Sequence, residues 1–165
     1  SSLDGIMADD SSYENEVVML IGLPCSGKST IRDKYPNHGV LSWDDTMESM
    51  TEGATYGEKF KNCDDKKVRQ ELNNQRNRLI SEKKDVIIDM TNLTRKSRRK
   101  RLNPFPASYK RKAIVCLAGM DTIYKRNEER KEVGKYIDRH VFKRMMKYTY
   151  PACYDEFDEI EWILN

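Results

Sequence analysis

Residues Leu20 to Thr30 read "LIGLPCSGKST", and within this stretch Gly22 to Ser29 match the phosphate-binding loop pattern G-x-x-x-x-G-K-[S/T] at every fixed position. The two glycines allow a loop whose backbone amides point inward, at the start of a helix whose partial positive charge favours phosphate oxygens. In this pattern the lysine reaches the β- and γ-phosphates, and the hydroxyl that follows ligates Mg²⁺. The sequence therefore predicts a site for ATP or GTP with Mg²⁺, with contacts from Gly22, Pro24, Cys25, Ser26, Gly27, Lys28, Ser29 and Thr30.

Short apolar runs alternate with amphipathic segments along the rest of the chain. Continuous apolar runs are typical of strands buried on both faces, as in a parallel sheet covered by helices. The predicted fold class is α/β, a P-loop NTPase or kinase fold with a parallel sheet of about four to five strands, helices on both faces and a helical lid. We expect strands at 17–21, 40–43, 85–89 and 112–119, a strand or turn at 159–164, helices at 28–35, 64–84, 94–102, 121–131 and 137–149, and a loop at 51–62.

Composition argues against several classes of protein. Of the 165 residues 38% are hydrophobic, the net charge is +3, and no apolar run approaches the length of about 20 residues that a membrane-spanning helix needs. The four cysteines have no CxxC spacing, which argues against a structural zinc site and favours a reducing compartment. We expect a cytoplasmic protein (in the host cytoplasm if a phage encodes it) without membrane contact. Residues 1–12 are predicted to be a disordered tag remnant, and residues 13–165 a single domain.

Two adjacent aspartates, Asp44 and Asp45, follow the second predicted strand. Ligands of open parallel sheets bind at the carboxyl edge of the strands, so both side chains are expected near the site. A carboxylate there can accept the proton of an attacking hydroxyl, and we predict this role for Asp44. The alternative role is that of a cap for the helix expected to begin here, which fits Asp45 as well as contact with an acceptor does.

The third predicted strand also ends in polar residues. Asp89 has a Walker-B-like position, from which it can bind Mg²⁺ directly or through water. Thr91 and Asn92 follow at the same edge of the sheet, where they can contact an acceptor. Their alternative role is to cap the turn.

Residues 95–101 ("RKSRRKR") contain lysine or arginine at six of seven positions. Such a density is unfavourable unless an anion lies nearby, and further cations follow at 109–112 and 143–147. Nucleic-acid phosphates are one natural partner, and a solvated helix face is the alternative. We therefore predict DNA or RNA as substrate, and no feature of the sequence indicates an obligate protein partner.

Arg126 and Arg130 are spaced i, i+4, which puts both side chains on one face of a predicted helix. An arginine above the γ-phosphate neutralises the charge that develops during phosphoryl transfer. The alternative for both side chains is pairing with Glu129 or Glu132 on the same helix.

Four segments together resemble the 5′-polynucleotide kinase family, especially the kinase domain of the phage type. They are "IGLPCSGKST" at 21–30, "WDD" at 43–45, "VIIDMTNLT" at 86–94 and "KRNEER" at 125–130. The resemblance covers most of the chain, from Val17 to about Tyr148. The order and spacing of the four segments make it more specific than the phosphate-binding loop alone.

The resemblance implies roles for individual residues. Lys28 would stabilise the transferring phosphate, Ser29 would bind Mg²⁺, Asp44 would activate the acceptor hydroxyl, and Arg130 would be the lid arginine, supported by Arg126. The predicted acceptor contacts are Asp45, Met47, Asp89, Thr91, Asn92 and Arg95, and the predicted metal ligands are Ser29 and Asp89.

Two departures from the family pattern concern the acceptor. Met47 occupies the position where the family carries an arginine that binds the acceptor's phosphate. Met90 replaces the family's aspartate, and Asp89 provides a carboxylate one position earlier. The basic segment at 95–101 is a candidate source of a replacement phosphate contact.

The leading hypothesis is a kinase that transfers the γ-phosphate of ATP to a nucleic-acid hydroxyl, most simply a polynucleotide 5′-hydroxyl. One alternative is a kinase of a hydroxymethylated pyrimidine base, such as 5-hydroxymethyluracil, within DNA. Two others are a kinase of a small molecule or nucleotide, and a P-loop module that binds nucleotide without catalysis.

Overall fold

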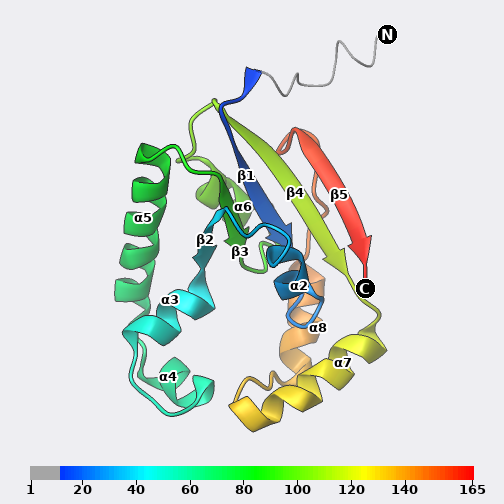
Figure 1. Cartoon of the computed structure of the whole chain (residues 1–165). Helices are drawn as coiled ribbons and strands as arrows, with labels where there is room; N and C mark the ends of the chain where they lie inside the picture. The colour runs from blue at the N-terminus through cyan, green and yellow to red at the C-terminus, as the bar shows by residue number, and fades with distance from the viewer. Residues whose placement is uncertain (1–11) are drawn as a thin grey trace.

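The structure, a computed structural model, describes residues 12–165, so the predicted tag remnant lies almost wholly outside the described residues. Its centre is a parallel sheet of five strands in the order β2-β3-β1-β4-β5 (Figure 1). This topology confirms the predicted α/β class, and the last candidate strand is a true parallel partner of β4. The strands are β1 (Asn15–Ile21), β2 (Gly39–Ser42), β3 (Val86–Asp89), β4 (Tyr109–Leu117) and β5 (Glu159–Leu164).

The register of the sheet decides where the functional segments meet. Leu20 of β1 and Ser42 of β2 are both in register with Asp89 at the end of β3. The phosphate-binding loop, the Asp44 segment and the Thr91 segment therefore all leave the sheet at the same edge.

Alternate residues of β1 are buried in two different hydrophobic clusters. Val17 and Met19 pack on one face with Met47, Val68 and Leu102, whereas Val18 and Leu20 pack on the other with Ile31. Both faces of the sheet are thus covered, as the continuous apolar strand predicts. The helices are α2 (Lys28–Arg32), α3 (Trp43–Met50), α4 (Tyr56–Asn62), α5 (Asp65–Ser81), α6 (Arg95–Leu102), α7 (Met120–Glu129) and α8 (Arg139–Tyr148), with a 3₁₀ turn, η2 (Arg130–Val133), after α7.

Three local predictions are wrong. The expected loop at 51–62 contains α4, whose N-cap Thr55 accepts a hydrogen bond from the amide of Glu58, a capping pattern readable in the sequence. The helix after the phosphate-binding loop ends at Arg32, three residues early. The cap of α3 is Ser42, whose side chain accepts from the amide of Asp45, so neither aspartate caps that helix.

Within residues 12–165, no helix combines the length and the apolar character that crossing a lipid bilayer requires.

Candidate active site

The phosphate-binding loop wraps around the side chain of Lys28. Its Nζ donates to the carbonyls of Gly22 (2.7 Å) and Leu23 (3.0 Å), which keeps the ammonium at the centre of the loop. Gly27 has a φ of 98°, a left-handed conformation that favours glycine. The amide of Gly22 donates to the Thr91 carbonyl over 3.0 Å and ties the loop to the end of β3.

The unused polar groups of this loop fit a phosphate chain. Among residues 12–165, no hydrogen-bond partner is found for the buried hydroxyl of Ser26, nor for the amides of Gly27, Lys28 and Ser29. Inward-facing amides of this kind bind phosphate oxygens. The side chain of Ser29 belongs to an exposed residue and lines the adjoining cavity, where its hydroxyl is free to ligate a metal ion.

Burial lowers the pKa of Lys28 from its usual value near 10.5 to about 8. Desolvation disfavours the charged form, and the nearby Asp89 carboxylate offsets only part of that effect. An incoming anion would stabilise the ammonium again. The loop therefore holds a lysine whose charge responds to whether phosphate is bound.

The lid consists of α7, η2 and the turn at 134–138. Two of its arginines, one in α7 and one in η2, contact the same loop. Arg126 Nη1 donates to the carbonyl of Cys25 (2.9 Å), and Arg130 Nη1 lies 3.1 Å from the Cys25 sulfur. Neither guanidinium pairs with a carboxylate among the described residues. The sequence alternative of pairing with Glu129 or Glu132 is thus not realised, and three cations converge on one short loop.

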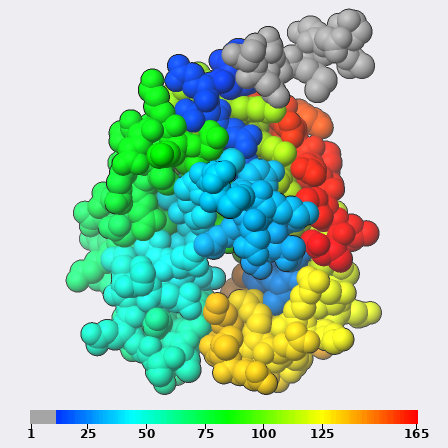
Figure 2. All heavy atoms as spheres, in the orientation of Figure 1, coloured from blue at the N-terminus to red at the C-terminus, as the bar shows by residue number. Residues whose placement is uncertain are grey.

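A cavity of about 990 Å³ adjoins this cationic group and reaches the ends of β2 and β3. Figure 2 shows the molecule hollowed here, between the cyan α3–α4 region and the yellow to orange lid. Asp44 lines the cavity, and its Oδ1 accepts a hydrogen bond of 2.9 Å from the hydroxyl of Tyr56. Burial and the Asp44 carboxylate both raise the pKa of Tyr56, so the phenol stays a proton donor to Asp44.

The two other predicted carboxylates are held by one arginine. Arg32 pairs with Asp45 and, over 3.2 Å, with Asp89. Asp89 lies close enough to Lys28 to influence its charge, so it remains on the phosphate side of the cavity. Asp45 instead has an exposed side chain that anchors Arg32.

Glycines from α4 and the lid close the cavity on one side. A side chain on Gly57 would approach the Gly134 carbonyl to 3.1 Å, and Gly134 itself has a left-handed φ of 73°. Lys135 extends the contact, since its Nζ lies 4.0 Å from Glu48 and 4.9 Å from the centre of the Tyr56 ring. The remaining wall is largely apolar or aromatic and includes Trp43, Tyr56, Phe60, Met90, Tyr136, Ile137, Val141 and Met145.

Three of the predicted acceptor residues do not line the cavity. Met47 is fully buried in the hydrophobic core and does not line the cavity. Asn92 is buried, and its amide donates to the carbonyls of Leu20 (2.7 Å) and Met90 (3.2 Å), so it joins β1 to the turn after β3. Arg95 pairs with Asp155 away from the cavity, whereas Thr91 does line it.

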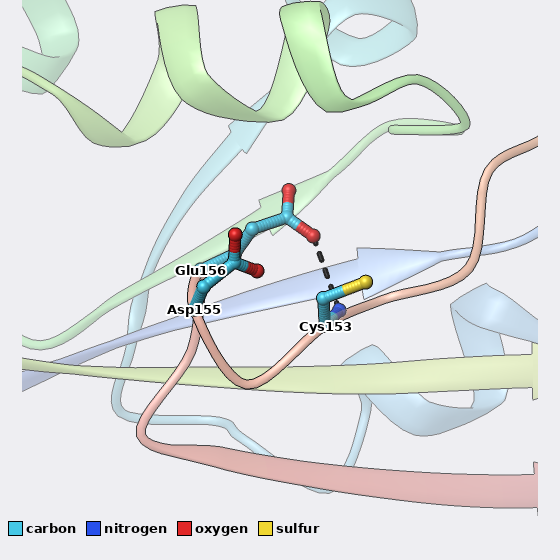
Figure 3. Close-up of side chains that lie close together, drawn as sticks. All are labelled: Cys153, Asp155 and Glu156. Carbon is cyan, nitrogen blue, oxygen red and sulfur yellow. Dashed lines mark hydrogen bonds between the residues drawn. The ribbon is translucent and has the colours of Figure 1, made fainter.

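Carboxylates of the chain itself neutralise part of the positive charge of the basic helix α6. Figure 3 shows Cys153, Asp155 and Glu156 in the turn before β5, with the amide of Cys153 donating to Glu156 over 3.1 Å. Arg98 is fully buried, pairs with Glu156 (2.9 Å) and donates to the carbonyls of Asn92, Tyr150 and Pro151. Because arginines neutralise both carboxylates, this cluster anchors α6 to the C-terminal segment.

Sequence reasoning missed several residues that line the cavity. Tyr56 and Phe60 lay in the expected loop, and the Thr55–Glu58 capping pattern was the signal that could have found their helix. Arg32 and Arg101 reach the cavity from helices whose sequences alone do not say which residues face it.

Comparisons with known proteins agree with this architecture. A family model described as an AAA domain matches residues 17–152. A structure described as a putative kinase from Chloroflexus aurantiacus aligns with a TM-score of 0.67 and 14% identity, over 92% of this chain and 88% of that one. Kti12 of Chaetomium thermophilum, in complex with ADP-AlF3, aligns with a TM-score of 0.58 and 16% identity, over 90% of this chain and 88% of that one.

A third similar structure is a chain of the Pnkp1/Rnl/Hen1 RNA repair complex. The TM-score is 0.66 and the identity 19%, over 82% of this chain but only 44% of the other. The present chain therefore corresponds to less than half of that protein. At such identities the three likenesses establish the fold, which is that of P-loop kinases.

Proposed function

Since the chain belongs to the AAA domain family of the matching model and has a P-loop kinase fold, we propose that it is a phosphotransferase acting on a hydroxyl of a nucleic acid. The donor is ATP or GTP, and the simplest acceptor is a polynucleotide 5′-hydroxyl. One observation carries the proposal: three cations that have no carboxylate partner in the described part of the chain surround the phosphate-binding loop, and Asp44 lines the same cavity.

On the donor side, the chain's own groups bind and neutralise the triphosphate. The loop amides hold phosphate oxygens, while Lys28, Arg126 and Arg130 offset the charge that spreads over the γ-phosphate oxygens. The Ser29 hydroxyl and Asp89 would hold Mg²⁺, which supplies further charge neutralisation when bound. Asp89 must then share its carboxylate between the metal ion and Arg32.

On the acceptor side, Asp44 is the general base. The acceptor oxygen forms a bond to the γ-phosphorus, the bond from that phosphorus to the bridging oxygen breaks, and the nucleoside diphosphate leaves. The hydroxyl proton passes to Asp44. Tyr56 holds this carboxylate in a fixed orientation through its hydrogen bond.

Surface charge supports a nucleic acid as the molecule that carries the hydroxyl. Three cations of α6 are exposed (Lys96, Arg99 and Lys100), all four lysines and arginines of α8 are exposed, and neither helix contains an acidic residue. Tyr148 and Tyr150 at the end of α8 are exposed, with Lys147 5.8 Å from the first ring and Arg95 5.6 Å from the second. Cations bind phosphates and exposed aromatic rings stack on bases, which suits a single strand.

A second acceptor is favoured by the contact that closes one side of the cavity. The contact between Gly57 and Gly134, together with the aromatic wall, suits a compact group such as a free nucleotide or a hydroxymethylated base extruded from DNA. The same donor machinery would serve either acceptor.

The test uses γ-labelled ATP with Mg²⁺ and three acceptors in parallel: a 5′-hydroxyl oligonucleotide, a duplex with hydroxymethylated bases, and free nucleotides. Label on the oligonucleotide end is expected. If label appears on the duplex alone, or on free nucleotides alone, that compound is the acceptor and the polynucleotide 5′-hydroxyl is not. Normal ATP binding without transfer to any of them would overturn the proposal in favour of a binding module.

A further inference from the structure

The arginines and lysines that line the cavity differ in their partners. Lys28, Arg126 and Arg130 surround the phosphate-binding loop, while Arg32 is paired with Asp45 and Asp89. Lys135, which also lines the cavity, has Glu48 nearby. The remaining cation is Arg101 of α6, which lines the cavity and pairs with no carboxylate within residues 12–165.

The structure holds Arg101 in place from one side. Its Nη1 donates to the side-chain oxygen of Asn92 over 2.8 Å. Asn92 is itself fixed, because it is buried and its amide nitrogen donates to the carbonyls of Leu20 and Met90. A guanidinium carries five N–H donors, and among the described residues only one of them has a partner, so the others are open to a ligand.

Arg98, one turn earlier on the same helix, provides the internal comparison. It is more deeply buried than Arg101, yet Glu156 and three carbonyls satisfy its guanidinium. Arg101 has no such set, and burial lowers its pKa, which means that desolvation of its charge is not offset. A partly buried cation without a counter-ion is unfavourable until an anion binds.

The neighbours of Arg101 belong to the acceptor side of the cavity. Its partner Asn92 follows Met90 and Thr91, and both of these line the cavity at the end of β3. Thr91 adds a side-chain hydroxyl for which no hydrogen bond is found among the described residues. A guanidinium and a hydroxyl that line one cavity are both suited to a tetrahedral oxyanion, which arginine binds through two parallel hydrogen bonds.

We propose that Arg101 binds a phosphate group of the acceptor, so that the substrate is a phosphorylated hydroxyl compound, a nucleotide or polynucleotide, in preference to a free nucleoside or sugar. The inference rests on the proposed function and narrows its substrate class. It also explains how an acceptor phosphate can be bound although position 47 carries no arginine and is occupied by a methionine buried in the core. The phosphate contact comes from α6, a different element.

The experiment measures acceptor binding without turnover. The full chain is saturated with ADP and Mg²⁺, and the four deoxynucleoside 3′-monophosphates and the four matching nucleosides are titrated calorimetrically. At least one monophosphate should bind about tenfold or more tightly than its nucleoside, as a charge-assisted bidentate contact provides. Arg101→Ala should abolish this difference, and Arg101→Lys should retain part of it.

The matched control is Arg69→Ala, which removes an exposed arginine of α5 outside the cavity and should keep the preference. Equal affinities for phosphorylated and unphosphorylated ligands in the unaltered protein would overturn the proposal, as would a preference that survives in both folded Arg101 variants. ADP affinity is measured for the same variants. If Arg101→Ala weakens ADP binding and leaves the preference for the monophosphates intact, Arg101 contacts the donor, and the proposal is overturned.

Transfer assays separate this inference from the proposed function. Phosphate-dependent binding without transfer to any acceptor would retain the Arg101 site and reject the kinase. Transfer to nucleosides and nucleotides with equal kcat/KM would retain the kinase and reject the Arg101 site.

Discussion

The hydroxyl of Tyr56 donates a hydrogen bond to Asp44 Oδ1 over 2.9 Å, and the two residues belong to different helices, α4 and α3. The same tyrosine ring faces Lys135 of the lid, 4.9 Å away. One side chain thus connects the proposed general base with the segment that follows Arg126 and Arg130, the arginines proposed to bind the donor phosphates. This relationship makes the candidate site specific enough for the following predictions.

Asp44→Asn should remove the general base while keeping the size and shape of the side chain. We expect kcat to fall by about 10²–10⁴-fold, the usual contribution of a positioned base. ADP affinity should be unchanged, because Asp44 does not belong to the phosphate-binding loop. Steady-state transfer and calorimetric ADP binding measure the two effects, and Asp33→Asn, an exposed carboxylate outside the cavity, is the control.

Tyr56→Phe should keep the ring in the cavity wall and remove only the hydrogen bond to Asp44. A decrease in kcat of about tenfold is expected, within the range of a lost hydrogen bond to a charged group. The midpoint of thermal unfolding should stay close to that of the unaltered protein. An unchanged kcat in Tyr56→Phe would show that the base does not depend on this contact.

Nucleotide affinity should depend on pH through Lys28, whose pKa burial lowers to about 8. As pH rises through that value the ammonium loses its proton, so ADP affinity should fall by at most about tenfold per pH unit. Binding above this pH should also take up a proton, detectable as a buffer-dependent enthalpy. Lys28→Arg keeps its charge at alkaline pH, and its affinity, whatever its absolute value, should be flat over the same range.

Arg130→Ala should slow transfer by about 10³-fold, because arginines that neutralise the transferring phosphoryl group have effects of that order. Arg126→Ala should weaken nucleotide binding and transfer less severely, since its observed contact is a loop carbonyl. Lys131→Ala removes a neighbouring exposed cation that pairs with Glu128, and it should leave both quantities nearly unchanged. Equal rates for the Arg130 and Lys131 variants would contradict the lid assignment.

Arg98→Ala should lower the free energy of unfolding by about 3–5 kcal/mol, the range found when one partner of a buried ion pair is removed. Its loss would remove the buried cation that pairs with Glu156 and the donor to three carbonyls. The adjacent Arg99 is exposed, so Arg99→Ala should change stability by less than about 0.5 kcal/mol. Urea unfolding followed by circular dichroism compares the two variants.

Local sequence signals found the phosphate-binding loop because its residues are close together in the chain. The pattern from Gly22 to Ser29 carries its own geometry, and apolar runs are enough to identify buried strands. The acceptor half was harder to predict. Its residues come from α3, α4, the turn after β3, α6 and the lid, and no local pattern says which of their side chains share a cavity.

The basic segment at 95–101 shows the same division. The sequence contains six cations in this segment and predicts an anionic partner, but it does not show which of the six cations would contact that partner. In the folded chain Arg95 and Arg98 pair with acids some sixty residues later, Arg101 lines the cavity, and Lys96, Arg99 and Lys100 face solvent. The side chains of α6 project in different directions around the helix, and the packing of α6 against the sheet decides which of them are buried.

By itself, the sequence determined the α/β class, the phosphate-binding loop and the strands that carry the functional segments. These follow from residue spacing and hydrophobic pattern, which act over a few neighbouring residues. Only the tertiary structure decided that Met47 completes the core, that Tyr56 contacts Asp44, and that Arg101 pairs with no carboxylate of residues 12–165. The reason is that burial, ion pairing and desolvation depend on distances between segments far apart in the chain, and those distances are set by sheet register and helix packing.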